Sequence, residues 1–498
     1  MSETWANSTD GGNVDPWDSV ARRVGADLFL DLQPDPGAQS RGRSSRRRHA
    51  LAAALREAIA TGRLTPGTAL PPYRSLAADL GLARGTVSSV YSELVAEGWL
   101  TARRGSGTRV ADGVTAPPAP RAIGTARAPF LGTAVRHDFA LGQPNTGLFP
   151  RTAWINATRD ALSGAPDDVF APGHPQGRPE LRRVLADYLA RARGVHASAD
   201  DIVLMTGVQG SLELLSHNVF GDRVAVESYG LPFHRMAIER GGTEVVPVAV
   251  DHHGLIVDEL TRLDVSAVVL TPSHQFPTGV ALHPERRAQL IAWARHTGAL
   301  IVEDDYDGEF RYDRSPVGAL QALGPDVVIY AGSVSKSLSP AVRIGWLVLP
   351  TRLVDTVAWA KGVREPDASL LDQLVLAQMI TSGAYDRHIR RSRQFYRRRT
   401  DALTARLATI GIEVPGVAAG LHTVIPVAAD TESALVARAH EQGIALAGLD
   451  FFRHPGSPRL PDGGLVVGFG TPSASSFGAD LDALAALLYL PKRRLRAE

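Results

Sequence analysis

The chain has 498 residues, which is room for two or three domains, and it contains no cysteine, so disulfides and thiolate metal sites are excluded. No run of about 18 apolar residues occurs, so no membrane span is expected, and the acidic, polar N-terminus is unlike a signal peptide. The net charge of +1 hides an asymmetry, because residues 1–40 carry −5 while residues 41–110, with twelve arginines and four acidic residues, carry +8. These features predict a cytoplasmic protein with a basic, nucleic-acid-binding module near its N-terminus.

The first 40 residues are polar and acidic, and we expect them to form a mostly disordered tail. A helical spacing of apolar residues begins after His49, at Leu51, Leu55 and Ile59. A short helix over 75–80 is expected to stop at Gly81, and another helix is expected over 84–98. Two short strands around a glycine-containing tip are predicted over 100–110. Two helices joined by a tight turn and followed by a hairpin indicate a winged helix-turn-helix over residues 41–111.

The fixed spacings in this segment resemble the GntR-type winged helix. They are Gly62 to Pro71, Arg74 to Ala77, Arg84 to Val87 and Glu97 to Leu100. The resemblance implies that double-stranded operator DNA is a partner. It also implies which residues face the DNA, on the helices and on the wing: Arg74, Arg84, Thr86, Ser88, Arg104, Ser106 and Gly107. Arginines at the start of a recognition helix can reach phosphates or base edges, and phosphate contact is the more common role.

Residues 112–136 are rich in Ala, Pro, Gly and Thr and are predicted to be a semi-extended linker. From residue 137 onward, apolar strands alternate with helical segments, which predicts an α/β domain with a mostly parallel sheet. The strands are expected at 203–205, 224–227, 245–250, 268–270, 300–303 and 327–330. The end of the chain, from about residue 385 to 498, is expected to form a smaller α/β lobe. Ligands of such sheets bind beyond the carboxyl ends of the strands.

Lys336 is one of only three lysines among 53 basic residues, so this chain uses arginine almost everywhere else. A lysine can lose its proton and form a Schiff base with a carbonyl, which arginine cannot do. Ser333, Ser335 and Arg343 surround it with groups that suit a phosphate. Asp304, at the end of a predicted strand, could pair with a protonated ring nitrogen. Neither the acidic loop nor the lysine is decisive alone, since each also fits an ordinary surface loop.

In family order, Pro277-Thr278-Gly279, Asp304-x-Tyr306 and Ser333-x-Ser335-Lys336 followed by Arg343 resemble the fold type I aminotransferases. Together with the winged helix, the chain resembles the MocR subfamily of GntR regulators, which includes PdxR- and GabR-like proteins. The resemblance implies pyridoxal 5′-phosphate (PLP) as cofactor, with Lys336 as the Schiff-base lysine, Asp304 on the ring nitrogen and Tyr306 at the phenolic oxygen. It implies that the phosphate is held by Val208, Gln209, Ser333, Ser335 and Arg343. No metal is expected.

Several positions depart from the aminotransferase pattern. Val466 stands where an arginine anchors the substrate carboxylate, and Phe276 stands where an asparagine precedes the Pro-Thr-Gly turn. The ring-stacking position falls on Leu231, with Tyr229 or Phe233 as alternatives after a small shift. Loss of the bidentate arginine removes a charge-assisted anchor, which disfavours transamination of ordinary amino acids.

These departures favour a sensor over an enzyme. The leading hypothesis is a PLP-binding transcriptional regulator of the PdxR type, which controls vitamin B6 metabolism, acting as a head-to-tail domain-swapped homodimer. PLP itself or an amino-acid-like ligand is the expected effector. Two alternatives stay open: an active aminotransferase that also binds DNA, and a DNA-binding dimer whose PLP domain is vestigial.

Overall fold

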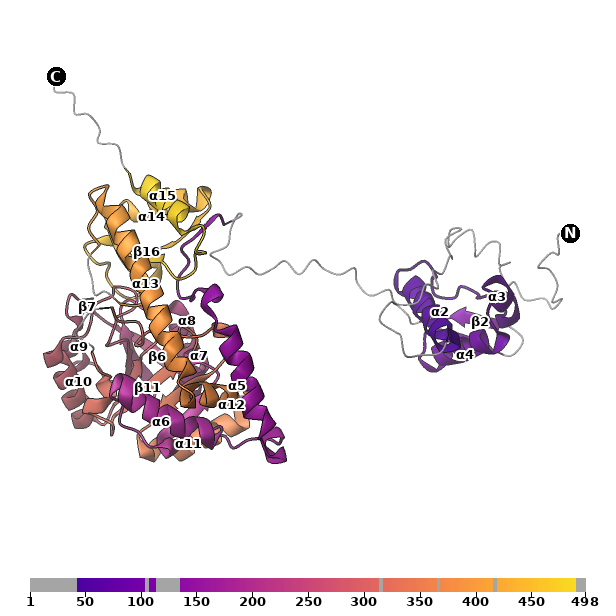
Figure 1. The fold of residues 1–498 in the computed structure, drawn as a ribbon, viewed down its shortest axis with the longest axis horizontal. Helices are drawn as coiled ribbons and strands as arrows, with labels where there is room; N and C mark the ends of the chain where they lie inside the picture. Colours follow the sequence, from indigo (N-terminus) through magenta and orange to yellow (C-terminus); the bar gives the residue numbers. More distant parts are fainter. Residues whose placement is uncertain are drawn as a thin grey trace, which may run out of the picture. The chain divides into compact units, whose positions relative to one another are not determined.

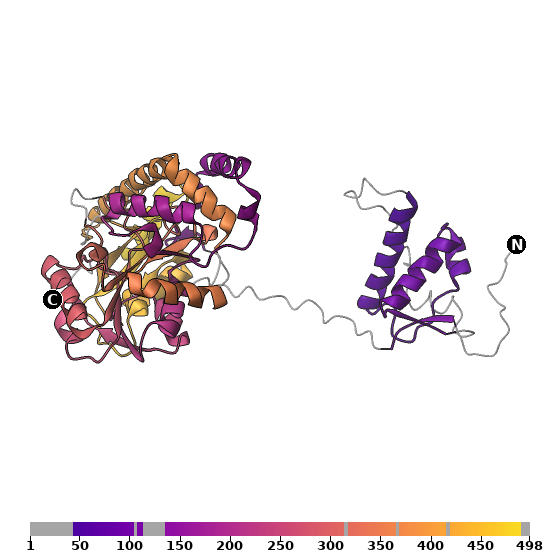
Figure 2. The same cartoon turned by 90° about the horizontal axis from the view of Figure 1, so that it is seen from below.

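The chain divides into two compact units, residues 1–127 and 128–498 (Figures 1 and 2). This computed structural model describes residues 43–103, 107–112, 135–312, 317–364, 368–414 and 419–489. The predicted tail over 1–40, most of the predicted linker, and the wing residues Arg104 and Ser106 lie outside these ranges. Within the described ranges, no helix combines the length and the apolar character needed to cross a bilayer.

The smaller unit has the predicted helix-turn-helix and wing. Its elements are α2 (Arg43–Ala60), α3 (Tyr73–Asp79), α4 (Arg84–Ala96), β1 (Leu100–Arg103) and β2 (Gly107–Val110). β1 and β2 pair antiparallel, with Leu100 opposite Val110. The third predicted helix, expected over 84–98, is present as α4 and ends at Ala96, two residues before the predicted end. Gly81, between α3 and α4, has a φ of +59°, a conformation that favours glycine.

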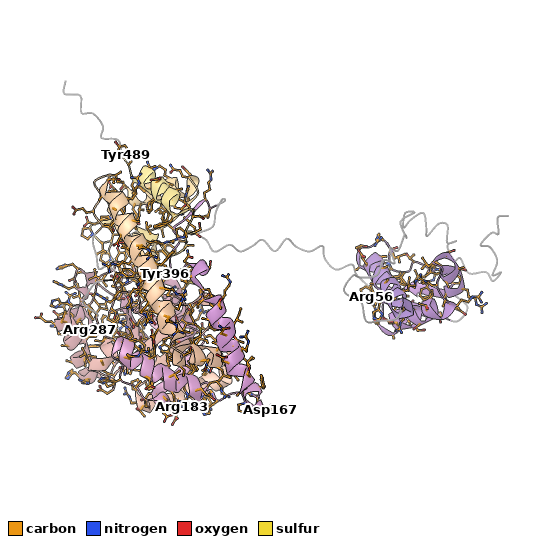
Figure 3. The ribbon with its side chains drawn as sticks, viewed as in Figure 1. Arg56, Asp167, Arg183, Arg287, Tyr396 and Tyr489 are labelled. Atoms are coloured by element: carbon orange, nitrogen blue, oxygen red, sulfur yellow. The ribbon has the colours of Figure 1, made fainter. Side chains whose placement is uncertain are left out.

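Two kinds of contact join α2 to α4 in this unit. Leu51, Leu55 and Ile59 of α2 are buried with Val87 and Leu94 of α4 in one apolar cluster. On the surface, the Arg56 guanidinium (labelled in Figure 3) bonds to the carboxylates of Glu93 and Glu97 at 2.6–2.9 Å. Apolar burial provides most of the stability here, because exposed ion pairs contribute little.

The larger unit is built on a seven-stranded sheet in the order β4-β12-β11-β10-β9-β5-β6. Its strands are β4 (Ile202–Met205), β5 (Arg223–Glu227), β6 (Glu244–Val248), β9 (Ala267–Leu270), β10 (Leu300–Asp304), β11 (Val328–Ser333) and β12 (Gly345–Val348). In this sheet β12 runs antiparallel to both of its neighbours, and the remaining pairs are parallel. The prediction of a mostly parallel sheet is therefore confirmed.

Helices cover both faces of this sheet. Ile329 and Ala331 of β11 face one cluster, formed with α7 (Val208–Asn218), α8 (Pro232–Arg240) and α11 (Val354–Arg364). Val328 and Tyr330, which alternate with them, face the opposite side. The helices on that opposite side are α5 (Arg151–Ser163), α6 (Pro179–Arg193), α9 (Val257–Leu260), α10 (Pro284–Thr297) and α12 (Leu370–Thr381). Because both faces are covered, the strands are mostly apolar, and their charged residues, such as Arg223, Glu244 and Asp304, stand at the strand ends.

A smaller lobe has its own core and a three-stranded sheet in the order β13-β16-β15. Its elements are β13 (His422–Val427), α14 (Glu432–Glu441), β15 (Ala447–Gly448), β16 (Gly463–Gly468) and α15 (Phe477–Leu488). α13 (Ala384–Ala408) contacts both α12 and α15, and Figure 1 shows it running from one lobe to the other. Short pairings complete the unit: β3 (His137–Asp138) with β14 (Ile444–Ala445), and β7 (Val250–Asp251) with β8 (Gly254–Leu255).

A buried ion pair joins α6 to the end of β10. Arg193 bonds to both carboxylate oxygens of Asp305, at 2.6 and 2.9 Å, and the hydroxyl of Tyr330 donates to the same carboxylate at 2.7 Å. The guanidinium also donates to the Val317 carbonyl and to the Ser273 hydroxyl at 3.2 Å. Both charged side chains are almost fully buried. These bonds connect α6 to the residues that follow β10 and to β11, near the carboxyl ends of the strands.

We expect Arg193→Met to lower the free energy of unfolding by about 3–5 kcal/mol, because it leaves the Asp305 carboxylate buried without its cation. Urea unfolding followed by circular dichroism measures the change. Arg295→Met is the matched control, since Arg295 makes an equally short bond to Asp326 with both side chains about half exposed. That control is expected to cost less than about 1 kcal/mol. Equal losses from the two variants would contradict the assignment.

Candidate cofactor site and DNA-binding surface

Strand register brings the predicted site residues to one edge of the sheet. Gly345 of β12 lies opposite Met205 of β4 on one side and opposite Ser333 of β11 on the other. The loops that leave β4 and β11 therefore meet around the start of β12. A Cβ atom at Gly345 would lie only 3.0 Å from the Cα of Gly207, so glycine permits this close approach. The Gly207–Gln209 turn and the 333–343 loop, far apart in sequence, become neighbours.

The half-buried amine of Lys336 lies in this edge loop. Its Nζ donates a hydrogen bond to the carbonyl of Gly142, which belongs to the first described segment of the larger unit. Burial lowers the pKa of Lys336 below its usual value, although the charges of Asp304 and Asp307 oppose this shift. A lowered pKa makes the neutral, nucleophilic amine easier to form.

Alternation along β10 separates the three carboxylates that follow one another in sequence. Glu303 accepts hydrogen bonds from the backbone N–H groups of Leu320 and Gln321, and Asp305 pairs with Arg193. Asp304, between them, points to the other face of the sheet. Of these three carboxylates, only that of Asp304 therefore faces the site.

Asp304 is 3% exposed, and its Oδ1 atom has no hydrogen-bond partner. Burial, and after it the charge of Asp305, raises the pKa of Asp304 to about 7. A buried carboxylate oxygen without a partner is unfavourable unless a ligand supplies a donor. A protonated pyridine nitrogen is such a donor, so the residue fits its predicted role.

Several groups at this edge suit a phosphate. α7 begins at Val208 without a side-chain cap, and the first N–H groups of a helix lack partners within the helix. Gln209 is exposed, and the serines Ser333 and Ser335 are half-buried. Arg343 is exposed and holds a left-handed backbone with φ of 57°, which costs a non-glycine residue roughly 1–3 kcal/mol. Such conformations cluster at functional sites, so this one is consistent with an anion-binding loop.

A buried histidine-carboxylate cluster, which the sequence analysis missed, surrounds Tyr306. The Nδ1 atom of His274 lies 2.7 Å from Asp307 Oδ2 and 2.9 Å from the Tyr306 hydroxyl. The ring of His422 lies 5.3 Å from that of His274, and burial is the main cause that lowers its pKa to about 3. The only sequence signal was the position of His274 three residues before the Pro-Thr-Gly turn. This cluster orients the Tyr306 hydroxyl.

Val466, at the position where aminotransferases carry an arginine, is completely buried in an apolar cluster. Phe276, Tyr229 and Phe452 belong to the same cluster. Val466 offers no charge to bind a ligand carboxylate. The aromatic rings packed around it make this side of the site apolar.

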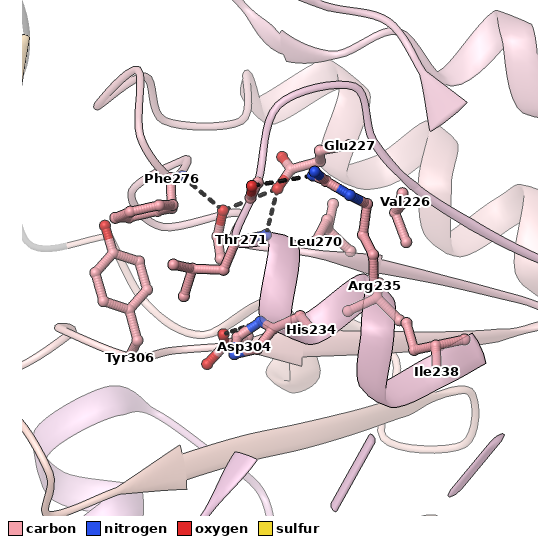
Figure 4. Close-up of a pocket in the computed structure, with 13 residues that line it drawn as sticks. Val226, Glu227, His234, Arg235, Ile238, Leu270, Thr271, Phe276, Asp304 and Tyr306 are labelled. Atoms are coloured by element: carbon pink, nitrogen blue, oxygen red, sulfur yellow. Dashed lines mark hydrogen bonds and ion pairs between the residues drawn. The ribbon is translucent and has the colours of Figure 1, made fainter. Parts of the chain in front are cut away.

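A cavity of about 50 Å³ opens beside Asp304 (Figure 4). Leu231, His234, Phe276 and Tyr306 are among its lining residues. Of the three predicted stacking candidates, Leu231 lies in this cavity, while Tyr229 lines a different one. Phe233 is 41% exposed at the surface. Within the described residues, no group of three or more metal-ligating side chains could hold an ion.

The predicted DNA-facing residues of the smaller unit lie on α3, α4 and β2. Arg74 and Arg84 are exposed, whereas Thr86 and Ser88 are half-buried. Gly107 is exposed at the described end of the wing, with φ of +79°. α4 begins at Arg84 with no side-chain cap, so its first N–H groups are available to a phosphate.

Two families match different parts of the chain: bacterial regulatory proteins of the gntR family over residues 47–110, and aminotransferase class I and II over residues 137–461. The "HTH-type pyridoxine biosynthesis transcriptional regulator PdxR" of Corynebacterium glutamicum is 33% identical, over 84% of this chain and 90% of that protein. The "probable rhizopine catabolism regulatory protein MocR" of Rhizobium meliloti is 32% identical, over 83% and 88%. A solved kynurenine aminotransferase of Pyrococcus horikoshii is 26% identical, with a TM-score of 0.65 over 71% of this chain and 91% of that one.

We expect Asp304→Asn to stabilise the unliganded protein more at pH 8 than at pH 5. An acid whose pKa rises on folding, here from 3.8 to about 7, keeps a proton that the unfolded chain releases. The free energy of unfolding of the wild type therefore falls as pH rises from 3.8 to about 7, and it stays lower at higher pH. At about 1.4 kcal/mol per pH unit, the gain from the substitution reaches about 4 kcal/mol at pH 8.

Urea unfolding of cofactor-free protein at the two pH values measures this difference. Asp326→Asn is the matched control, because Arg295 lowers the pKa of Asp326 and the substitution should not stabilise the protein at pH 8. An effect of Asp304→Asn that is the same at both pH values would contradict the buried, unpaired carboxylate.

Proposed function

Since the chain belongs to the HTH-type transcriptional regulators that join a GntR domain to an aminotransferase class I and II domain, we propose that it binds PLP and operator DNA and couples the two. The observation that carries the proposal is the unpaired buried oxygen of Asp304 at the same sheet edge as the Lys336 amine. PLP supplies an aldehyde and a ring nitrogen, which match these two groups.

Different residues of the chain bind different parts of PLP. Lys336 provides the amine for the aldehyde, and Asp304 accepts a hydrogen bond from the ring nitrogen. Tyr306, oriented by His274, lies at the phenolic oxygen. The phosphate is held at the α7 N-terminus and the neighbouring loop by Val208, Gln209, Ser333, Ser335 and Arg343.

The site favours sensing over amino-acid turnover. Val466 and the apolar cluster around it provide no cation for an α-carboxylate, which a transaminase needs to orient its substrate. We propose PLP itself as the effector, a choice consistent with the pyridoxine-biosynthesis regulator among the relatives. Control of vitamin B6 metabolism is the corresponding physiological role.

We also propose that the protein is a homodimer, with a head-to-tail, domain-swapped arrangement. The larger unit exposes large apolar side chains that a partner subunit would cover: Trp359 is 69% and Val363 is 65% exposed on the same face of α11. Operator DNA as a partner implies action in the cytoplasm. Sedimentation as a monomer at micromolar concentration would contradict the dimer.

A contact inside the larger unit offers a route from cofactor to DNA. Lys336 bonds to the carbonyl of Gly142, and the segment that contains Gly142 follows the predicted linker directly in the chain. An amine engaged by PLP would no longer be available to the Gly142 carbonyl. We propose that PLP binding in this way changes which half-sites two winged helices reach together.

Purified protein titrated with PLP should gain the visible absorption of a lysine-linked cofactor, and Lys336→Ala should not. Lys336→Arg is the matched control, because it keeps the charge and the donor but cannot form the covalent link. PLP should change operator affinity or the DNA footprint of the wild type and of neither variant. Absence of the absorption in the wild type, or an unchanged footprint and affinity, would contradict the proposal.

Arg84→Ala should weaken binding to duplex DNA selected from a random library by the full-length protein. If Arg84 contacts a phosphate, the loss is similar for all sequences and the slope of log affinity against log salt falls by about one. Fluorescence anisotropy at several salt concentrations measures both quantities. Arg63→Ala, at an exposed turn of the same unit, is the control. Equal behaviour of the two variants would remove Arg84 from the interface.

A further inference from the structure

The wall of the cavity beside Asp304 carries an aromatic ring at a position that the sequence pattern did not indicate. Leu231 is the N-cap of α8 and His234 lies three residues later, within the helix. Both line the cavity, and Figure 4 shows His234 next to Asp304. The other aromatic residue of α8, Phe233, is 41% exposed. Tyr229 is engaged elsewhere, since its hydroxyl accepts a hydrogen bond from the Leu460 N–H at 2.9 Å.

His234 lies next to Asp304 without occupying its hydrogen-bonding capacity. The Nδ1 atom of His234 is 3.7 Å from Asp304 Oδ2, which is longer than a hydrogen bond. Asp304 Oδ1 has no partner at all. The carboxylate is therefore free to accept a bond from a ring nitrogen while the imidazole stays beside it.

The surroundings of the imidazole favour its neutral form at neutral pH. Burial, followed by the charges of Lys336 and Arg235, lowers the pKa of His234 to about 4. A neutral ring can pack on the face of a protonated pyridine, whereas an imidazolium would repel it. Leu231 and Ile238, which line the same cavity, add apolar contacts at the edges of such a stack.

We propose that His234 packs its imidazole against one face of the pyridine ring of PLP, in place of the aromatic side chain expected at Leu231. The proposal rests on the proposed binding of PLP. It identifies His234 as a positioning residue that holds the ring while Asp304 and Lys336 bind its two reactive positions.

The cavity beside Asp304 is small compared with a pyridine ring. About 50 Å³ is too small for a six-membered ring, since a cavity of roughly 150 Å³ holds benzene. A ring that enters here therefore extends beyond this volume or displaces a lining side chain. If His234 instead fills the place of the pyridine ring, removing it should improve PLP binding, so one experiment separates the two arrangements.

The experiment is an absorption titration of cofactor-free, full-length protein with PLP. His234→Ala should raise the Kd roughly tenfold, because ring stacking and its buried contacts are lost, and His234→Phe should stay within about threefold of the wild type. Phe233→Ala, which removes an exposed ring from the same turn of α8, should leave the Kd unchanged. Unfolding midpoints of the cofactor-free variants show whether each remains folded.

Each result supports or overturns the assignment. Weakening by alanine with rescue by phenylalanine supports a stacking ring, because a purely structural role of the imidazole would not be restored by a benzene ring. Equal or tighter binding by His234→Ala overturns it and indicates that the imidazole occupies the ring's place. Failure of the wild type to bind PLP overturns the proposed function itself, and that outcome is visible before any variant is made.

Discussion

The unpaired carboxylate of Asp304 is the constraint on which the rest of the site depends. A carboxylate that is 3% exposed with one oxygen unbonded is costly in the unliganded protein, and its pKa rises accordingly. Its neighbours in sequence cannot share that role, because strand alternation turns Glu303 and Asp305 to the opposite face. There they are satisfied by backbone N–H groups and by Arg193. The site is thus arranged to be completed by a ligand that brings a hydrogen-bond donor.

The groups around Asp304 suit the proposed cofactor and leave little for a substrate. Lys336, the α7 N-terminus and Arg343 lie at one sheet edge because the antiparallel β12 brings the ends of β4 and β11 together. On the other side, Val466 and the rings near it form an apolar wall. An aminotransferase fold whose sheet edge suits PLP and whose other wall is apolar agrees with the proposed response to PLP.

The proposed coupling between the cofactor site and the winged helix rests on a short stretch of chain. The segment around Gly142 is bound to the smaller lobe, since the Phe139 N–H donates to the Ala445 carbonyl and the Thr471 hydroxyl donates to the Ala140 carbonyl. Lys336 reaches the same segment from the large sheet. One amine therefore connects the cofactor site, the smaller lobe and the part of the chain next to the linker.

The sequence by itself determined the two domain types, the winged helix elements and six of the seven strands of the large sheet, while β12 was not predicted. Apolar periodicity and glycine turns are local properties, so they can be read from neighbouring residues. It also singled out Lys336, because lysine is rare in this chain, and Asp304 through its place after a strand. Only the tertiary structure decided which groups satisfy Glu303 and Asp305 and that β12 lies between β4 and β11. It also decided that His274 and His422 flank Tyr306, and that His234 rather than Tyr229 or Phe233 lies beside Asp304. Those facts depend on strand register and on contacts between segments distant in sequence, which no local pattern encodes.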